Sequence, residues 1–186
     1  IKGGIIRTAE AIRLGIHAVV IYRLRDQGLM EQISRGVFRL NHLPSPENPD
    51  LITVAKRIPK SVICLISALA FHGLTTQIPK QVFIALPRQN MLPRMSYPPL
   101  RVFWFSATTI AAGVEVHRFD GVPVAIFSAE KTLADVFKYR NKIGMDVALE
   151  ALHIWRRKKG DLRKLLEFAK LCRVEKIIKP YLEATL

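Results

Sequence analysis

Three acidic side chains in the last third of the chain are the residues that could support metal-ion chemistry: Asp135, Asp146 and Glu150. Carboxylates that converge on Mg²⁺ can catalyse nucleotidyl transfer or nucleic-acid cleavage, usually from strand ends or from a fixed motif. These three fall instead on two expected helices with basic neighbours, and Lys131 stands one helical turn before Asp135, as in an ordinary helical ion pair. The chain also contains no GxxxxGK[ST] loop, no GxSxG and no HExxH motif. We therefore expect that the protein is not an enzyme, that it has no catalytic residue, and that it binds no metal or other cofactor.

The two cysteines do not suggest a metal or redox site either. Cys64 lies in an apolar run, Cys172 is far from it in sequence, and neither has CxxC or Cys/His spacing. Reduced thiols of this kind are typical of the cytoplasm. The longest apolar run, Val62–Ala70, is far too short to span a membrane, and no signal peptide is visible. We expect a cytoplasmic protein with no membrane partner.

Positive charge is the strongest feature of the composition. Lys and Arg number 29 against 15 Asp and Glu, so the 186-residue chain carries a net charge of +14. This balance favours polyanionic partners, above all nucleic acid. The strongest basic run, Arg156-Arg157-Lys158-Lys159, has two equally good interpretations. It is either a solvated helix end, where cations suit the helix dipole, or an additional contact for phosphate or for an acidic partner.

Spacing near the front of the chain predicts a helix-turn-helix. Thr8 is a candidate N-cap for a short helix, Gly15 provides the turn, and a second helix is expected over residues 18–27. Helical periodicity places three apolar side chains of that helix inward and leaves four on or near its outer face. The inward side chains are Val20, Ile21 and Leu24, and the outer ones are Val19, Tyr22, Arg23 and Asp26.

A basic hairpin follows the second helix. Residues 29–33 and 37–40 read as two short strands joined by Ser34-Arg35-Gly36, with the glycine suited to a turn. Arg35 at the tip and Arg39 on the return strand could contact phosphate. The order of helix pair and basic hairpin favours a DNA-binding winged helix over a structural unit that merely packs. Winged helices usually have a further helix before this pair, and we expect it to precede Ile1.

The rest of the chain predicts a second, larger domain. The proline-rich stretch Asn41–Asp50 reads as a linker, which gives a winged helix over residues 1–43 and a second domain over 44–186. Strands in the middle and helices at the end indicate an α+β fold with a small mixed or antiparallel sheet. The expected helices cover residues 51–56, 61–73, 129–139, 145–157, 162–169 and 174–184, and the expected strands cover 82–86, 101–105, 114–119 and 122–127.

Several phrases of the sequence resemble the AbiEi family of antitoxin repressors of bacterial type IV toxin–antitoxin systems. In the N-terminal part of the chain these segments are GIIRTAEAIRLGIH and IYRLRDQGLMEQISRGVFRL. In the rest of the chain they are PDLITVAKRIPKSVICLISALAFHGLTTQIP, FSAEKTLADVFKYRNKIGMDVALEAL and CRVEKIIKPYLEA. The rear phrases are long and unusual, and therefore more diagnostic than a helix-turn-helix, which many repressors share.

The resemblance implies a repressor whose winged helix binds inverted repeats in its own promoter. Its functional partner would be a nucleotidyltransferase toxin encoded next door, with which direct contact is not the typical mode. The DNA-contacting residues it implies are Thr8, His17, Ala18, Val19, Tyr22, Arg23 and Arg35. The alternative that the sequence leaves open is an interaction protein that neutralises the toxin directly through its basic C-terminal domain.

Overall fold

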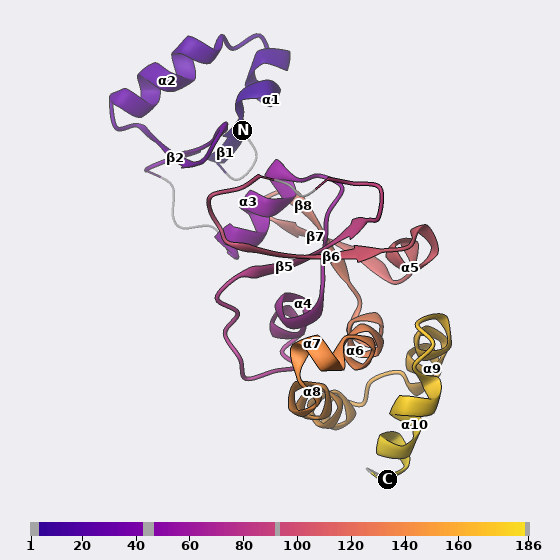
Figure 1. Ribbon diagram of the computed structural model, residues 1–186. Helices are drawn as coiled ribbons and strands as arrows, with labels where there is room; N and C mark the ends of the chain where they lie inside the picture. Colours follow the sequence, from indigo (N-terminus) through magenta and orange to yellow (C-terminus); the bar gives the residue numbers. More distant parts are fainter. Residues whose placement is uncertain (1–3, 43–46, 92–93, 185–186) are drawn as a thin grey trace.

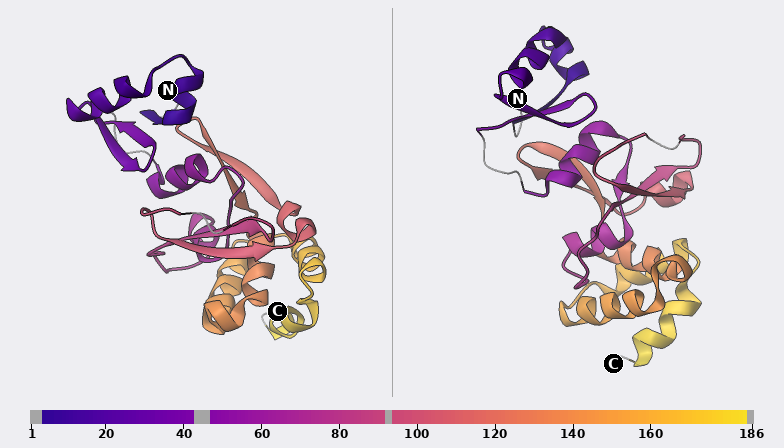
Figure 2. Two further views of the ribbon diagram at one scale, coloured as in Figure 1. Left: turned by 45° about the horizontal axis from the view of Figure 1, so that its top comes forward. Right: turned by 60° about the vertical axis from the view of Figure 1, so that its left-hand side comes forward.

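The fold is α+β and is built in layers. The computed structural model describes residues 4–42, 47–91 and 94–184. A small helix-and-sheet unit forms one end of the molecule, a five-stranded sheet lies in the middle, and a group of helices forms the other end (Figure 1). Both further views show the same order of parts (Figure 2). No helix among the described residues is long and apolar enough to cross a membrane.

The front unit has the topology of a winged helix. It consists of β1 (Ile5–Arg7), α1 (Thr8–Arg13), α2 (Ala18–Asp26), β2 (Met30–Ser34) and β3 (Val37–Leu40). The three strands form an antiparallel sheet in the order β1-β3-β2. The predicted helix pair and hairpin are confirmed, whereas β1 was not predicted, because three residues are too few to reveal an alternating pattern. The helix expected before this unit lies outside the described residues.

A small apolar core holds the winged helix together. Ile6, Ala11, Ile21, Met30 and Phe38 are buried in it, one from each of the five elements. Val20, predicted to point inward, is 42% exposed instead. The reason is that α2 packs on α1 and β2 through the side that carries Ile21.

The rear sheet is mixed, as the sequence allowed. Its strands are β4 (Val62–Ile63), β5 (Val82–Pro87), β6 (Leu100–Phe105), β7 (Val114–Phe119) and β8 (Val122–Phe127), in the order β6-β5-β4-β8-β7. β5 pairs with β6 in parallel, and the predicted strands β7 and β8 pair with each other as an antiparallel hairpin. Because side chains alternate along a strand, Phe83 and Ala85 face one apolar layer while Val82, Ile84 and Leu86 face another.

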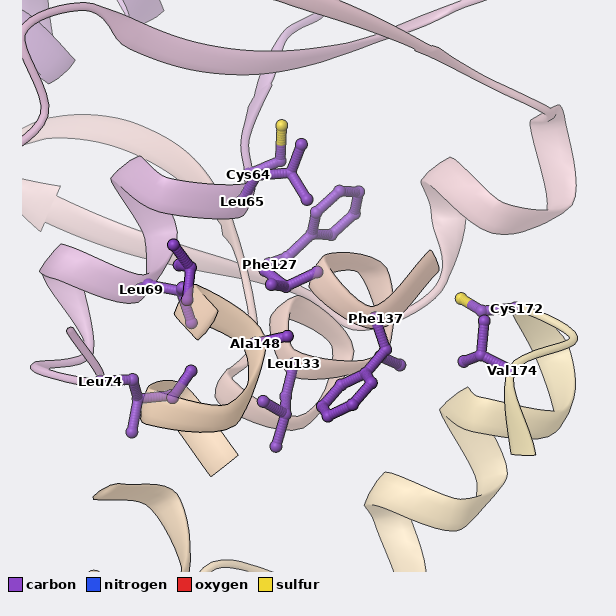
Figure 3. Packing of buried hydrophobic residues seen from close by; sticks show 14 of the residues in the cluster. Cys64, Leu65, Leu69, Leu74, Phe127, Leu133, Phe137, Ala148, Cys172 and Val174 are labelled. Atoms are coloured by element: carbon purple, nitrogen blue, oxygen red, sulfur yellow. The ribbon is translucent and has the colours of Figure 1, made fainter. Parts of the chain in front are cut away.

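Helices cover both faces of this sheet. They are α3 (Pro49–Arg57), α4 (Leu65–Phe71), α5 (Ala107–Ala111), α6 (Ala129–Lys138), α7 (Arg140–Ile143), α8 (Met145–Arg157), α9 (Leu162–Leu171) and α10 (Glu175–Ala184). α3 packs on one face together with the front sheet, since Ile5 and Val37 share its apolar cluster. The larger cluster lies on the other face, where Leu69, Phe127 and Leu133 meet between α4, β8 and α6 (Figure 3).

One predicted helix, residues 61–73, is wrong in its first part. Val62 and Ile63 form the central strand β4, paired with both β5 and β8, and the helix begins only at Leu65. β-Branched side chains favour an extended strand, and a strand buried on both faces is as continuously apolar as a buried helix. Two later helices begin at a side-chain cap: the side chains of Ser128 and Asp161 accept backbone N–H bonds at the starts of α6 and α9.

A charged pair is buried at the centre of the larger cluster. Lys131 and Asp135, one turn apart on α6, are both fully buried and form an ion pair. The Lys131 ammonium lies 4.2 Å from the centre of the Phe127 ring, and the Cys172 thiol donates to Asp135 at 3.2 Å. Burial raises the pKa of Asp135, and the neighbouring Lys131 opposes this effect without cancelling it.

Candidate nucleic-acid interface

The exposed side of α2 lies at the outer end of the molecule (Figure 1). His17, which precedes the helix, and Arg23 within it are exposed, and Val19 is 55% exposed. Ala18 is half-buried. The described residues provide no hydrogen bond or ion pair to the Arg23 guanidinium. Arg23 is therefore the α2 cation that is free to bind a phosphate or a base edge.

Tyr22 is anchored rather than free. Its ring packs edge-on against Phe38 of β3, with 5.5 Å between ring centroids, and it remains 40% exposed. Arg25 lies over the same ring and pairs with Asp26 at 2.7 Å. The acidic charge on this side of α2 is thus neutralised locally. Tyr22 consequently offers a fixed, half-exposed phenol beside Arg23.

The turn of the hairpin carries the second group of predicted contacts. Arg35 is exposed at the tip, with no ion pair among the described residues. Gly36 adopts a φ of +73°, as its turn position requires. The turn lies beside α3 of the rear domain, where Arg57 approaches the place that a Gly36 side chain would occupy. Sequence reasoning missed Arg57, because its proximity to the tip depends on how the two units pack.

Arg39 has a structural partner. It stands opposite Glu31 across β2 and β3, and its guanidinium pairs with that carboxylate at 3.1 Å. Its side chain is only 16% exposed. The charge of Arg39 is therefore matched by Glu31 within the hairpin, and the pair stabilises the wing.

Thr8 does not cap α1, contrary to the prediction. The N-cap is Arg7, which makes no side-chain cap bond, and Thr8 is the first helical residue. The Thr8 backbone N–H donates to the Gly36 carbonyl at 3.0 Å, which ties α1 to the hairpin turn. Its hydroxyl is buried and has no hydrogen-bond partner among the described residues. In this structure the Thr8 hydroxyl is therefore not exposed to a ligand.

The substitution Thr8→Val should therefore stabilise the protein. A methyl group replaces an unsatisfied buried hydroxyl, whose desolvation costs about 1–3 kcal/mol. We expect the free energy of unfolding, measured by urea titration, to rise by about 1 kcal/mol, with unchanged DNA affinity. A loss of DNA affinity in a folded Thr8→Val variant would restore Thr8 to the interface.

The basic run Arg156–Lys159 lies at the end of α8, in the helical layer far from α2 (Figure 1). Lys158 donates to the backbone carbonyl of His72 at 2.8 Å, so it holds the end of α4. Arg156 is half-buried and already has an interaction partner within the protein. Arg157 and Lys159 are exposed. The run is thus partly structural and does not share a surface with α2.

The three acidic residues that could have held a metal do not converge. Asp135 is buried with Lys131, and Glu150 accepts bonds from the hydroxyls of Thr75 and Thr76 at 2.9 and 2.7 Å. Within the described ranges, no group of three His, Cys, Asp or Glu side chains could hold a metal ion. Asp135 therefore belongs to the buried core, and Glu150 attaches the loop that follows α4.

One ion pair links the winged helix to the rear domain. Lys56 of α3 donates to Glu10 of α1 at 2.8 Å, and this bond lowers the pKa of Glu10. The pair borders an open cavity between the two units, whose lining also includes Arg7 and Pro123. The orientation of α1 relative to α3 thus depends in part on this contact.

The contribution of the Glu10–Lys56 ion pair to the free energy of unfolding should depend on pH. Because the folded-state pKa of Glu10 is lowered, its contribution is present at neutral pH and is lost as pH falls through that pKa. We expect Glu10→Gln to cost less than about 1 kcal/mol at pH 7, and a smaller amount at about pH 4, just below the ordinary glutamate pKa of about 4.3. Urea unfolding at the two pH values measures this, with Glu183→Gln as the control. A cost that is the same at both values would contradict the assignment.

Comparison with known proteins agrees with this geometry. Residues 1–41 match the sequence profile of a family described as "Transcriptional regulator, AbiEi antitoxin". The matched segment ends at the winged helix and leaves the rear domain uncovered. No curated protein matches the chain. The resemblance found in the sequence is therefore confirmed for the winged helix, and the matching family consists of transcriptional regulators.

Proposed function

We propose that the chain is a sequence-specific DNA-binding repressor that acts as the antitoxin of a type IV toxin–antitoxin system. The observation that carries this proposal is the free, exposed Arg23 on the outer helix of a winged helix whose residues match a family of transcriptional regulators. The net charge of +14 supports a polyanionic partner.

In the proposed complex, α2 enters the major groove of DNA. Its exposed side presents His17, Val19 and Arg23 to the bases and phosphates, with Tyr22 held beside them by Phe38. Arg35 contacts the backbone or the adjacent minor groove, as a wing does, and Arg57 extends the same basic edge from α3. The half-buried Ala18 and the buried hydroxyl of Thr8 contribute packing rather than contacts.

The operator is proposed to be a set of inverted repeats in the promoter of the protein's own gene. Two winged helices on such repeats would repress transcription of an operon that also encodes a nucleotidyltransferase toxin. The protein would then counter the toxin without an enzymatic activity of its own.

A reporter gene placed behind the upstream promoter tests this function in cells. Expression of the intact chain should repress the reporter, and the Arg23→Ala variant at equal abundance should not. A strain that carries the neighbouring nucleotidyltransferase should grow only when the chain is present. Unchanged reporter activity would contradict the repressor function, and unchanged growth would contradict the antitoxin function.

Direct neutralisation of the toxin is the second candidate, and the position of Arg157 and Lys159 favours it. These exposed cations lie in the helical layer, away from α2, and are therefore open to a partner other than the DNA bound there. Co-purification of the neighbouring gene product with the wild-type chain would support this function. It should be lost on Arg157→Glu with Lys159→Asn, the second change being chosen because asparagine tolerates the left-handed backbone of Lys159.

A further inference from the structure

A cationic pocket in the rear domain has no role in the proposed DNA contact. It has a volume of about 470 Å³, within the range of small-molecule sites. Four segments converge on it: the end of β5, the turn from β6 into α5, the end of α6, and the turn between α9 and α10. Its lining residues are Arg88, Ser106, Thr108, Thr109, Lys138, Leu171, Cys172 and Arg173.

The charges around this pocket are of one sign. Arg88, Lys138 and Arg173 are all exposed, and none forms an ion pair within the part of the chain that the structure describes. The lining includes no carboxylate. Three like charges around one cavity repel one another, and a bound anion would relieve that repulsion.

The floor of the pocket is buried and carries no net charge. Cys172 is 3% exposed there and donates to the buried Asp135, whose charge Lys131 matches (Figure 3 shows Cys172 at the turn after α9). Burial raises the pKa of the Cys172 thiol to about 12. The thiol is therefore neither a nucleophile nor a negative charge that would repel an anion.

Two segments of the pocket come from the same end of the sheet. β5 and β6 are parallel, Arg88 and Ser106 follow their carboxyl ends, and the Arg88 backbone N–H donates to the Phe105 carbonyl at 3.1 Å. Guanidinium groups match the oxygen geometry of phosphate, and the Thr108 hydroxyl is exposed to donate a further bond.

We propose that this pocket binds the phosphate groups of a small molecule of nucleotide size. A lone phosphate ion would leave most of the cavity empty, whereas a nucleotide would place its oligophosphate among the three cations and its remaining bulk toward Leu171. The proposal is independent of DNA binding by α2, because the two sites share no residue.

Calorimetric titration of the intact chain with ATP, with pyrophosphate and with adenosine at physiological salt tests the proposal. ATP and pyrophosphate should bind one to one, and adenosine should not bind. Arg88→Ala and Arg173→Asn should each weaken ATP binding about tenfold. Asparagine is used because Arg173 has a φ of +60°. Lys176→Ala on α10, which removes one exposed charge outside the pocket, should leave ATP binding within about twofold.

Several outcomes would overturn the proposal. They are no ATP binding at millimolar concentration, undiminished binding in both pocket variants, and an equal loss in Lys176→Ala. Binding of duplex DNA by the same variants is the remaining measurement. If the two pocket variants weaken duplex binding but leave ATP binding unchanged, the cations contact a DNA backbone and the pocket is not a nucleotide site. Thermal unfolding of each variant confirms that the comparison is made between folded proteins.

Discussion

The substitution Lys131→Met is expected to lower the free energy of unfolding by about 3–5 kcal/mol, the largest single effect anticipated in this protein. It leaves the Asp135 carboxylate in the core without its counter-ion, since both side chains are fully buried. The Phe127 ring also loses its contact with the Lys131 ammonium, which the variant lacks. Urea unfolding of the wild type and the variant measures the difference.

The pH dependence of the variant identifies the cause of this loss. Without Lys131, the strongest influence that opposes burial is lost, so the folded-state pKa of Asp135 rises further above the unfolded value of about 3.9, even though Cys172 and Lys138 still act to lower it. A raised acid binds more protons when folded, so the stability of the variant should decrease as pH rises from about 4 toward the folded-state pKa. Stability should therefore recover in acid, where the carboxyl is neutral.

Two further variants separate charge from packing. Leu133→Ala on the same helix should also cost about 2–5 kcal/mol, but without the acid recovery. The double variant Lys131→Met with Asp135→Leu should regain most of the lost stability, because an apolar pair removes the buried charge altogether. If Lys131→Met and Leu133→Ala show the same pH profile, the ion pair is not the source of the effect.

The second large effect is expected at Arg23. Arg23→Ala should weaken binding to the promoter duplex by about 1–3 kcal/mol, which corresponds to roughly 5-fold to 150-fold in affinity. If the guanidinium contacts a phosphate, the slope of log affinity against log salt should also fall by about one. Fluorescence anisotropy of a labelled duplex at several salt concentrations measures both quantities.

Arg163→Ala is the matched control for this variant. Arg163 is an exposed arginine of α9, in the helical layer at the opposite end of the molecule, and its loss changes the net charge by the same amount. We expect its effect on promoter affinity to be several times smaller than that of Arg23→Ala. Equal losses in the two variants would mean that DNA responds to total charge and not to the exposed side of α2.

Much of the fold could be predicted from local signals in the sequence. The Asp120-Gly121 turn places the hairpin β7–β8, and the caps Ser128 and Asp161 place the starts of α6 and α9. These features depend on residues close together in the chain. The winged helix could be predicted for the same reason, since its turns contain Gly15, Gly28 and Gly36, all with positive φ.

The remaining features depend on contacts between distant segments. Val62–Ile63 is a strand because β5 and β8 pair with it on either side, which no local pattern reveals. Arg39 is matched by Glu31 only because the register of the hairpin puts them opposite each other. The cationic pocket joins Arg88, Lys138 and Arg173, which lie 35 or more residues apart, so sequence reasoning had no signal for it.

The most direct test of the account is the specificity of DNA binding. The affinity of the wild-type chain for its upstream promoter duplex is compared with that for a shuffled duplex of the same composition, at one salt concentration. Specific DNA binders prefer their site by about 10³-fold or more, and we expect a ratio of that order, sharply reduced in Arg23→Ala. Equal affinity of the wild type for the two duplexes would contradict the account, because charge alone would then explain the binding.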